Sequence, residues 1–199
     1  MNKNIFDFYD LAIQLKGIER TGWTEVGIPK EKVESVADHV YGTMMLAMAV
    51  INEKKLSLDT KKVYEMIAIK ELKKISSKKE ESVISGSDTN EDTTKDILSK
   101  LSNSDELVSV YEEYNAKESK EAKFALMISK LESDIQAKKY ELEGYFTLDN
   151  AKKDIENYPE DIKSRLADIT NPSDGWLEYD RKYYDDFFME LSQDVQKLK

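Results

Sequence analysis

The chain has 199 residues, a formal net charge of -10 at neutral pH and no cysteine. The negative charge disfavours nucleic acid as a partner, because the surface as a whole repels a phosphate backbone. The absence of cysteine excludes disulfides, Cys-ligated zinc and thiol nucleophiles. No apolar stretch of 18 residues and no signal peptide are recognisable, so we expect a cytoplasmic protein that does not bind membranes.

Length and composition predict an all-α protein with a single domain over residues 1–199. The length fits one domain with a sizeable core. Charged residues make up 35% of the chain, and it has only 7 Gly and 3 Pro, which favours long helices over a sandwich or barrel. The expected architecture is a compact bundle of several helices.

Amphipathic helices are predicted along the first part of the chain. Ile5–Leu15 has an apolar side, and Gly17 would end that helix. Residues 17–32 are rich in turn formers and are expected to form a loop. The next helix runs from about Lys32 to Asn52, and a third begins after Leu58, where Asp59 or Thr60 can cap it.

The second half contains one strongly polar segment, for which we predict a mobile loop over about 76–92 and a short helix over 91–101. Further helices are expected over 105–114 with Ser104 as the cap, over 119–142, and twice within 151–199 around Pro159, with a turn at 171–175 and an aromatic stripe near the end.

The only histidine, His39, lies on a helical stripe of small side chains. Ser35, Gly42 and Thr43 are three or four residues from it and would share its face. Such a stripe leaves room for a ligand to approach the imidazole. A lone histidine on a half-apolar helix is nevertheless more often a satisfied core or boundary residue.

Three short motifs in this region carry a family resemblance: Arg20-Thr21-Gly22-Trp23, Gly27-Ile28-Pro29 and Glu34-Ser35-Val36-Ala37-Asp38-His39. They resemble the N-terminal signature of HD-domain metal-dependent phosphohydrolases, in particular the small 5'-deoxynucleotidase branch, and the similarity continues to about residue 190. The resemblance implies a helical HD fold, nucleoside monophosphate substrates, a divalent metal of the Mn, Co, Mg or Zn class, and a homodimer.

The resemblance also suggests a substrate-binding set of Arg20, Trp23 and Ser35. Arg20 would bind phosphate with its guanidinium, and Trp23 would form a wall against the nucleoside. The alternative is that Trp23 covers the core and Arg20 is its surface partner.

The metal ligands expected from the family are largely replaced. His39 matches the first ligand, and Glu71 keeps the carboxylate of the family's His-Asp or His-Glu doublet. Lys70 stands in place of the doublet histidine, and Ser129 in place of the distant aspartate. A lysine ammonium has no lone pair and repels a divalent cation, and a hydroxyl is a poor ligand. We therefore predict only a remnant metal site at His39 and Glu71, and no bound cofactor.

No catalytic residue is predicted, because Lys74 occupies the position of the family's catalytic acid. The ammonium of Lys70 could instead fill the space of the ion and pair with Glu71 or Asp38.

Three functions follow. The preferred hypothesis is a catalytically impaired or inactive relative of HD-domain phosphohydrolases that keeps a cleft for a nucleotide or another anion. The alternative is an active metal-dependent 5'-nucleotidase in which other carboxylates compensate for the lost ligands. The third is a helical interaction protein or an engineered scaffold.

Overall fold

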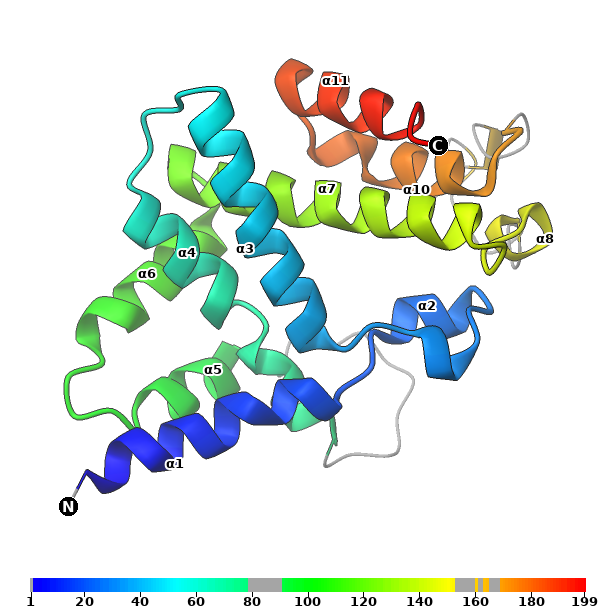
Figure 1. Cartoon of the computed structure of the whole chain (residues 1–199). Helices are drawn as coiled ribbons and strands as arrows, with labels where there is room; N and C mark the ends of the chain where they lie inside the picture. Colours follow the sequence, from blue (N-terminus) through cyan, green and yellow to red (C-terminus); the bar gives the residue numbers. More distant parts are fainter. Residues whose placement is uncertain (1, 79–90, 153–159, 161–162, 165–168) are drawn as a thin grey trace. The chain divides into compact units, whose positions relative to one another are not determined.

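The computed structural model of the protein describes residues 2–78, 91–152, 160, 163–164 and 169–199 (Figure 1). Within these ranges the chain is helical, and its only β-type pairing is an isolated antiparallel bridge between Glu19 and Ser35. The predicted all-α class is therefore confirmed. Among the described helices, none combines the length and apolar character that a membrane crossing requires.

The chain divides into two compact units, each made of two separate segments. Unit 1 comprises Met1–Glu19 and Glu34–Leu126, and unit 2 comprises Arg20–Val33 and Met127–Lys199. The prediction of one domain over residues 1–199 stays a prediction.

In unit 1, α4 packs against α3 and α6, and α5 packs against α6 and the 3-10 helix η3. Val63, Met66 and Ile67 are completely buried on α4, at the three- and four-residue spacing of an apolar helix face. The elements of this unit are α1 (Lys3–Ala12), η1 (Ile13–Gly17), α3 (Val36–Glu53), α4 (Thr60–Ile69), η3 (Leu72–Lys78), α5 (Glu91–Leu98), α6 (Asp105–Ala116) and the first residues of α7 (Lys120–Leu142).

Polar residues begin several of these helices, as predicted. Asp59 caps α4, because its carboxylate accepts a hydrogen bond from the Lys62 N–H at 3.2 Å. Ser104 precedes α6 at the expected position, but it has a helical conformation and its side chain makes no capping hydrogen bond. The Ser119 hydroxyl accepts from the Ala122 N–H at 3.1 Å at the start of α7.

In unit 2, an aromatic cluster forms the core. Trp23, Tyr140 and Phe146 are buried, and Trp176 packs against them. The elements are α2 (Thr21–Glu25), η2 (Lys30–Lys32), the rest of α7, α8 (Leu148–Ala151), α10 (Pro172–Asp180), η5 (Arg181–Tyr183) and α11 (Asp186–Val195).

Gly27 makes the turn between α2 and η2 possible. Its φ is +86°, and a Cβ at this position would lie 2.6 Å from the side-chain nitrogen of Asn150. A larger residue would therefore be strained in its backbone and would also collide with its neighbour.

Several predicted boundaries were wrong. The loop predicted over 17–32 contains α2 and η2. The helix predicted from Lys32 begins only at Val36. The turn predicted at 171–175 is the start of α10, because Pro172 takes a first-turn position in which its missing N–H costs nothing.

Other predictions lie partly outside the described residues. This applies to most of the mobile loop over 76–92 and to the helices around Pro159. Residues 76–78 belong to η3.

Candidate functional site

Helix α3 begins with a capping box. The Asp38 N–H donates to the Ser35 hydroxyl oxygen at 3.1 Å, and the Asp38 carboxylate accepts from the Ser35 N–H at 2.9 Å. The Ser35 hydroxyl also donates to this carboxylate at 2.8 Å. Ser35 has an extended conformation and precedes the helix. The prediction that it shares a helical face with His39 was therefore wrong, although its suggested role in substrate binding stays a prediction.

Ser35 is both the partner of Glu19 in the β-bridge and the N-cap of α3, so the capping box fixes the start of α3 directly after the bridge. It also places His39 at the end of the first turn, where the imidazole is only 2% exposed. Thr43 follows one turn later and is completely buried, and its hydroxyl oxygen has no hydrogen-bond partner among the described residues. Of the small residues on this stripe, Thr43 is thus buried, whereas Ser35 and Gly42 are partly exposed.

Lys70 is buried where α4 ends, at 4% exposure. Its ammonium forms an ion pair with the carboxylate of the next residue, Glu71. The side chains of the pair are 5% and 15% exposed. Of the two partners suggested for Lys70, Glu71 is therefore the one observed. Lys74 lies one turn further on and is exposed.

Two of the predicted ligand positions, Lys70 and Ser129, carry side chains that are poor ligands for a divalent metal. In unit 1, the doublet consists of an ammonium and a carboxylate that this ammonium already neutralises. In unit 2, Ser129 is 7% exposed, and its carbonyl accepts a hydrogen bond from the Ser133 hydroxyl at 3.2 Å. Its hydroxyl is a weak ligand compared with a carboxylate.

Arg20, at the start of unit 2, is held against α7. Its guanidinium donates to the Ser133 hydroxyl at 3.1 Å and lies 3.7 Å from the Glu132 carboxylate. It also lies over the Trp23 ring, 5.8 Å from the centroid. The Arg20 side chain is 23% exposed. Its suggested contact with phosphate stays a prediction.

Trp23 is a core residue of unit 2 and is 1% exposed. Its ring stacks on Trp176 with centroids 4.3 Å apart, and it forms a T-shaped contact with Tyr140 with centroids 5.2 Å apart. These contacts match the alternative in which Trp23 covers the core. A role as a nucleoside wall stays a prediction.

Sequence reasoning missed the buried polar side of α7. Glu132, Ser133, Asp134 and Lys138 are all less than 9% exposed, and none of them was predicted to be buried. Asp134 is completely buried, and burial raises the pKa of its carboxyl to about 7. The length of this helix could have indicated the burial of these residues, because other helices can pack against several sides of a long helix.

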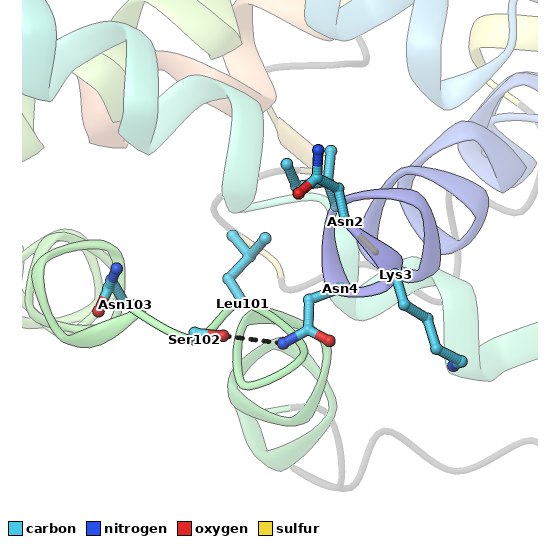
Figure 2. A pocket seen from close by; sticks show the side chains of 7 residues that line it. Asn2, Lys3, Asn4, Leu101, Ser102 and Asn103 are labelled. Atoms are coloured by element: carbon cyan, nitrogen blue, oxygen red, sulfur yellow. Dashed lines mark hydrogen bonds between the residues drawn. The ribbon is translucent and has the colours of Figure 1, made fainter.

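A pocket of about 430 Å³ lies in unit 1, at the N-terminal end of α1 (Figure 2). Asn2, Lys3 and Asn4 line one side, and Leu101, Ser102 and Asn103 line the other. The Asn4 amide donates to the Ser102 hydroxyl at 2.9 Å across it. None of the predicted site residues lines this pocket, so it does not bear on the predicted site.

Comparison with known proteins identifies relatives. The HD domain family model matches residues 12–166. The 5'-deoxynucleotidase HDDC2 of Danio rerio is 30% identical over 149 residues, which cover 71% of this chain and 72% of that protein. The 5'-deoxynucleotidase HDDC2 of Dictyostelium discoideum is 34% identical over 67 residues, and this alignment covers only 34% of either chain.

A solved structure supports the fold. A conserved hypothetical protein from Pyrococcus furiosus superimposes with a TM-score of 0.63 and 24% identity, covering 97% of this chain and 99% of that chain. The helical architecture, the extent of the family match and the similarity to the Danio rerio protein agree. This chain belongs to the HD-domain family.

Proposed function

We propose that this chain is an HD-domain protein that binds a nucleoside monophosphate or a similar phosphate ester and has lost most or all metal-dependent phosphohydrolase activity. The class of ligand comes from the relatives, which are named 5'-deoxynucleotidases. The proposed loss of hydrolysis is inferred from the chemistry of the residues that stand at the family's ligand positions.

One observation carries this proposal: the ammonium of Lys70 is buried and paired with Glu71. A cation at this position would repel a second, divalent cation at short range, and a lysine cannot act as a ligand until it deprotonates. Hydrolysis of a phosphate ester in this family needs that ion to polarise the phosphoryl group or to activate water. Without it, binding can persist while the chemical step is lost.

The names of the relatives favour a second candidate, an active metal-dependent 5'-nucleotidase acting on deoxynucleoside monophosphates. In that case other side chains would supply the missing ligands. Phosphate release from a panel of deoxynucleoside monophosphates, with Mn²⁺, Co²⁺, Mg²⁺ or Zn²⁺ added in turn, separates the two candidates. Turnover that depends on one of these ions would establish the nucleotidase and overturn the proposal of lost hydrolysis.

Nucleotide binding is tested separately, by the shift in melting temperature that each monophosphate causes. We expect an upward shift that is abolished in Arg20→Ala. Because Arg20 also contacts Ser133 and Glu132, the shift caused by the ligand is compared within each variant, rather than the melting temperatures themselves. Arg181→Ala is the matched control, since the exposed Arg181 pairs with Glu178, three residues earlier in unit 2. If no nucleotide or phosphate shifts the melting temperature, a helical interaction protein is the better description.

The cytoplasmic homodimer expected from the sequence remains part of this proposal. Light scattering of the purified protein measures its molar mass, and a monomer at all concentrations would remove the homodimer from it.

A further inference from the structure

A buried carboxyl group joins α7 to the C-terminal helix within unit 2. Asp134 lies in the middle of α7 and is completely buried. One of its oxygens, Oδ2, accepts a hydrogen bond from the Tyr184 hydroxyl at 2.7 Å and a second from the Ser192 hydroxyl. Tyr184 directly follows η5, and Ser192 lies on α11. A single oxygen atom therefore holds two points of the C-terminal segment against α7.

The other oxygen of the same carboxyl group is unsatisfied. Oδ1 of Asp134 is buried and accepts no hydrogen bond from any described residue. A buried ionised carboxylate is costly unless donors surround both of its oxygens. A neutral carboxylic acid avoids most of this cost and still accepts both hydroxyl hydrogen bonds at Oδ2. Burial of the carboxyl group, with no donor at Oδ1, therefore favours the neutral acid, whereas the two hydroxyl donors at Oδ2 favour the carboxylate.

Some of the charged groups around Asp134 raise the pKa of its carboxyl, and others lower it. Asp180, the last residue of α10, is 1% exposed and opposes ionisation of Asp134 by like-charge repulsion. Lys130, one turn earlier on α7, favours ionisation, but it lies 3.0 Å from Asp180 and is largely neutralised there. Burial raises the pKa of Asp180, and Lys130, Lys182 and Arg20 oppose that rise. Asp134 thus lies beside a second buried carboxyl group, and a negative charge on either one disfavours ionisation of the other.

We propose that Asp134 is a pH-dependent latch: protonated, it holds the segment Asp180–Val195 against α7, and its ionisation loosens that segment. The latch acts on the packing of unit 2 and does not depend on the proposed function. Because burial raises the pKa of Asp134 to about 7, a change of pH within the physiological range would alter its charge. The hydroxyls of Tyr184 and Ser192 partly oppose this shift, so removing either donor should raise the pKa further.

The direction of the effect on stability follows from this pKa. An unfolded chain has an aspartate pKa of about 4, so between about pH 4 and pH 7 the folded protein binds more protons than the unfolded one. The stabilising effect of the proton is fully present below this window. It decreases progressively as the pH rises through the window, the loss is complete above the folded pKa, and stability should not recover there.

The test compares the wild type, Asp134→Asn and Asp149→Asn. The asparagine at position 134 keeps an acceptor for both hydroxyls but cannot ionise, and Asp149 is an exposed aspartate of the same unit. Hydrogen exchange of the α11 amides, corrected for intrinsic rates, is followed from about pH 5 to about pH 8. We expect protection to fall roughly tenfold or more in the wild type and in Asp149→Asn, and to stay level in Asp134→Asn. Parallel profiles in the wild type and Asp134→Asn would overturn the latch.

A measurement on the wild-type protein covers the case in which Asp134→Asn does not fold. Carbon-13 NMR of the side-chain carboxyls gives the titration midpoint of Asp134 directly, and we expect it near neutral pH. Tyr184→Phe, which removes one donor to Oδ2, should move this midpoint upward. A midpoint below about pH 5 would contradict the proposal, because the carboxyl would then be ionised throughout the physiological range.

Discussion

The Lys70 ammonium and the Glu71 carboxylate, neighbours in the chain, form a nearly buried ion pair at the end of α4. In HD-domain phosphohydrolases, as the resemblance describes them, this doublet would provide two metal ligands. Here the two side chains neutralise each other instead. A buried pair adds little net stability, because desolvation offsets most of the attraction, but breaking one half is costly.

Glu71→Gln should therefore destabilise unit 1, because the Lys70 ammonium would lose its counter-charge while it stays buried. We expect a loss of roughly 1–3 kcal/mol in the free energy of unfolding, measured by urea denaturation, since the amide can still accept a hydrogen bond. Glu112→Gln is the matched control, because its pair with Lys95 is exposed on both sides. That variant should show no measurable change. Equal losses of unfolding free energy in the two variants would mean that burial of the Lys70–Glu71 pair does not affect its contribution to stability.

Removal of metal should leave the protein unchanged. If the ligand set is incomplete, as we predict, no metal binding is expected to be coupled to folding. The melting temperature should be the same before and after treatment with a chelator, and it should not rise when Mn²⁺ or Zn²⁺ is added back. A drop of several degrees on chelation would show that a structural ion had been bound.

Restoring the family's residues should create a metal site. In the triple variant Lys70→His, Lys74→Glu, Ser129→Asp, we expect the chain to retain a divalent ion after dialysis, detected by elemental mass spectrometry. Adding His39→Ala to this triple variant should release the ion and serves as its control. If the triple variant stays free of metal, the alignment of these three positions with the family is incorrect.

The start of α3 depends on the Ser35 hydroxyl, which accepts from the Asp38 N–H and donates to the Asp38 carboxylate. Ser35→Ala should cost about 1 kcal/mol of stability, whereas Ser35→Gly should cost only a few tenths. Chemical denaturation of both variants measures this difference. If Ser35 also binds a phosphate ester, both variants should weaken the ligand-induced shift in melting temperature to the same extent, whatever their stability.

Much of the fold could be predicted from the sequence because it depends on local patterns. The apolar spacing on α4 and the cap at Asp59 identify that helix directly. The region before α3 was harder to predict, because short helices such as α2 are stabilised by tertiary contacts, in this case the stacking of Trp23 on Trp176. Trp176 is 153 positions away in the chain, so the sequence around Trp23 does not indicate this contact.

The predicted site residues are only partly explained by sequence patterns. The pairing of Lys70 with Glu71 could be anticipated, because adjacent opposite charges at a helix end need no distant partner. The partners of Arg20 could not, since Glu132 and Ser133 are more than a hundred residues away on α7. Asp134 was also not singled out for burial, because its two hydroxyl partners come from the last segment of the chain.

The alternation of segments between the two units limits how this protein can be dissected. Arg20–Val33 belongs with the C-terminal part of the chain, although it is inserted between two stretches of unit 1. A fragment that ends at residue 126 would keep Trp23 but lack Tyr140 and Trp176, the rings that enclose it. Conversely, a fragment that begins at residue 127 would lack Trp23 and would leave a gap beside Tyr140 and Trp176. Truncation at the unit boundary would therefore expose an incomplete aromatic core in both products, and expression trials should use the whole chain.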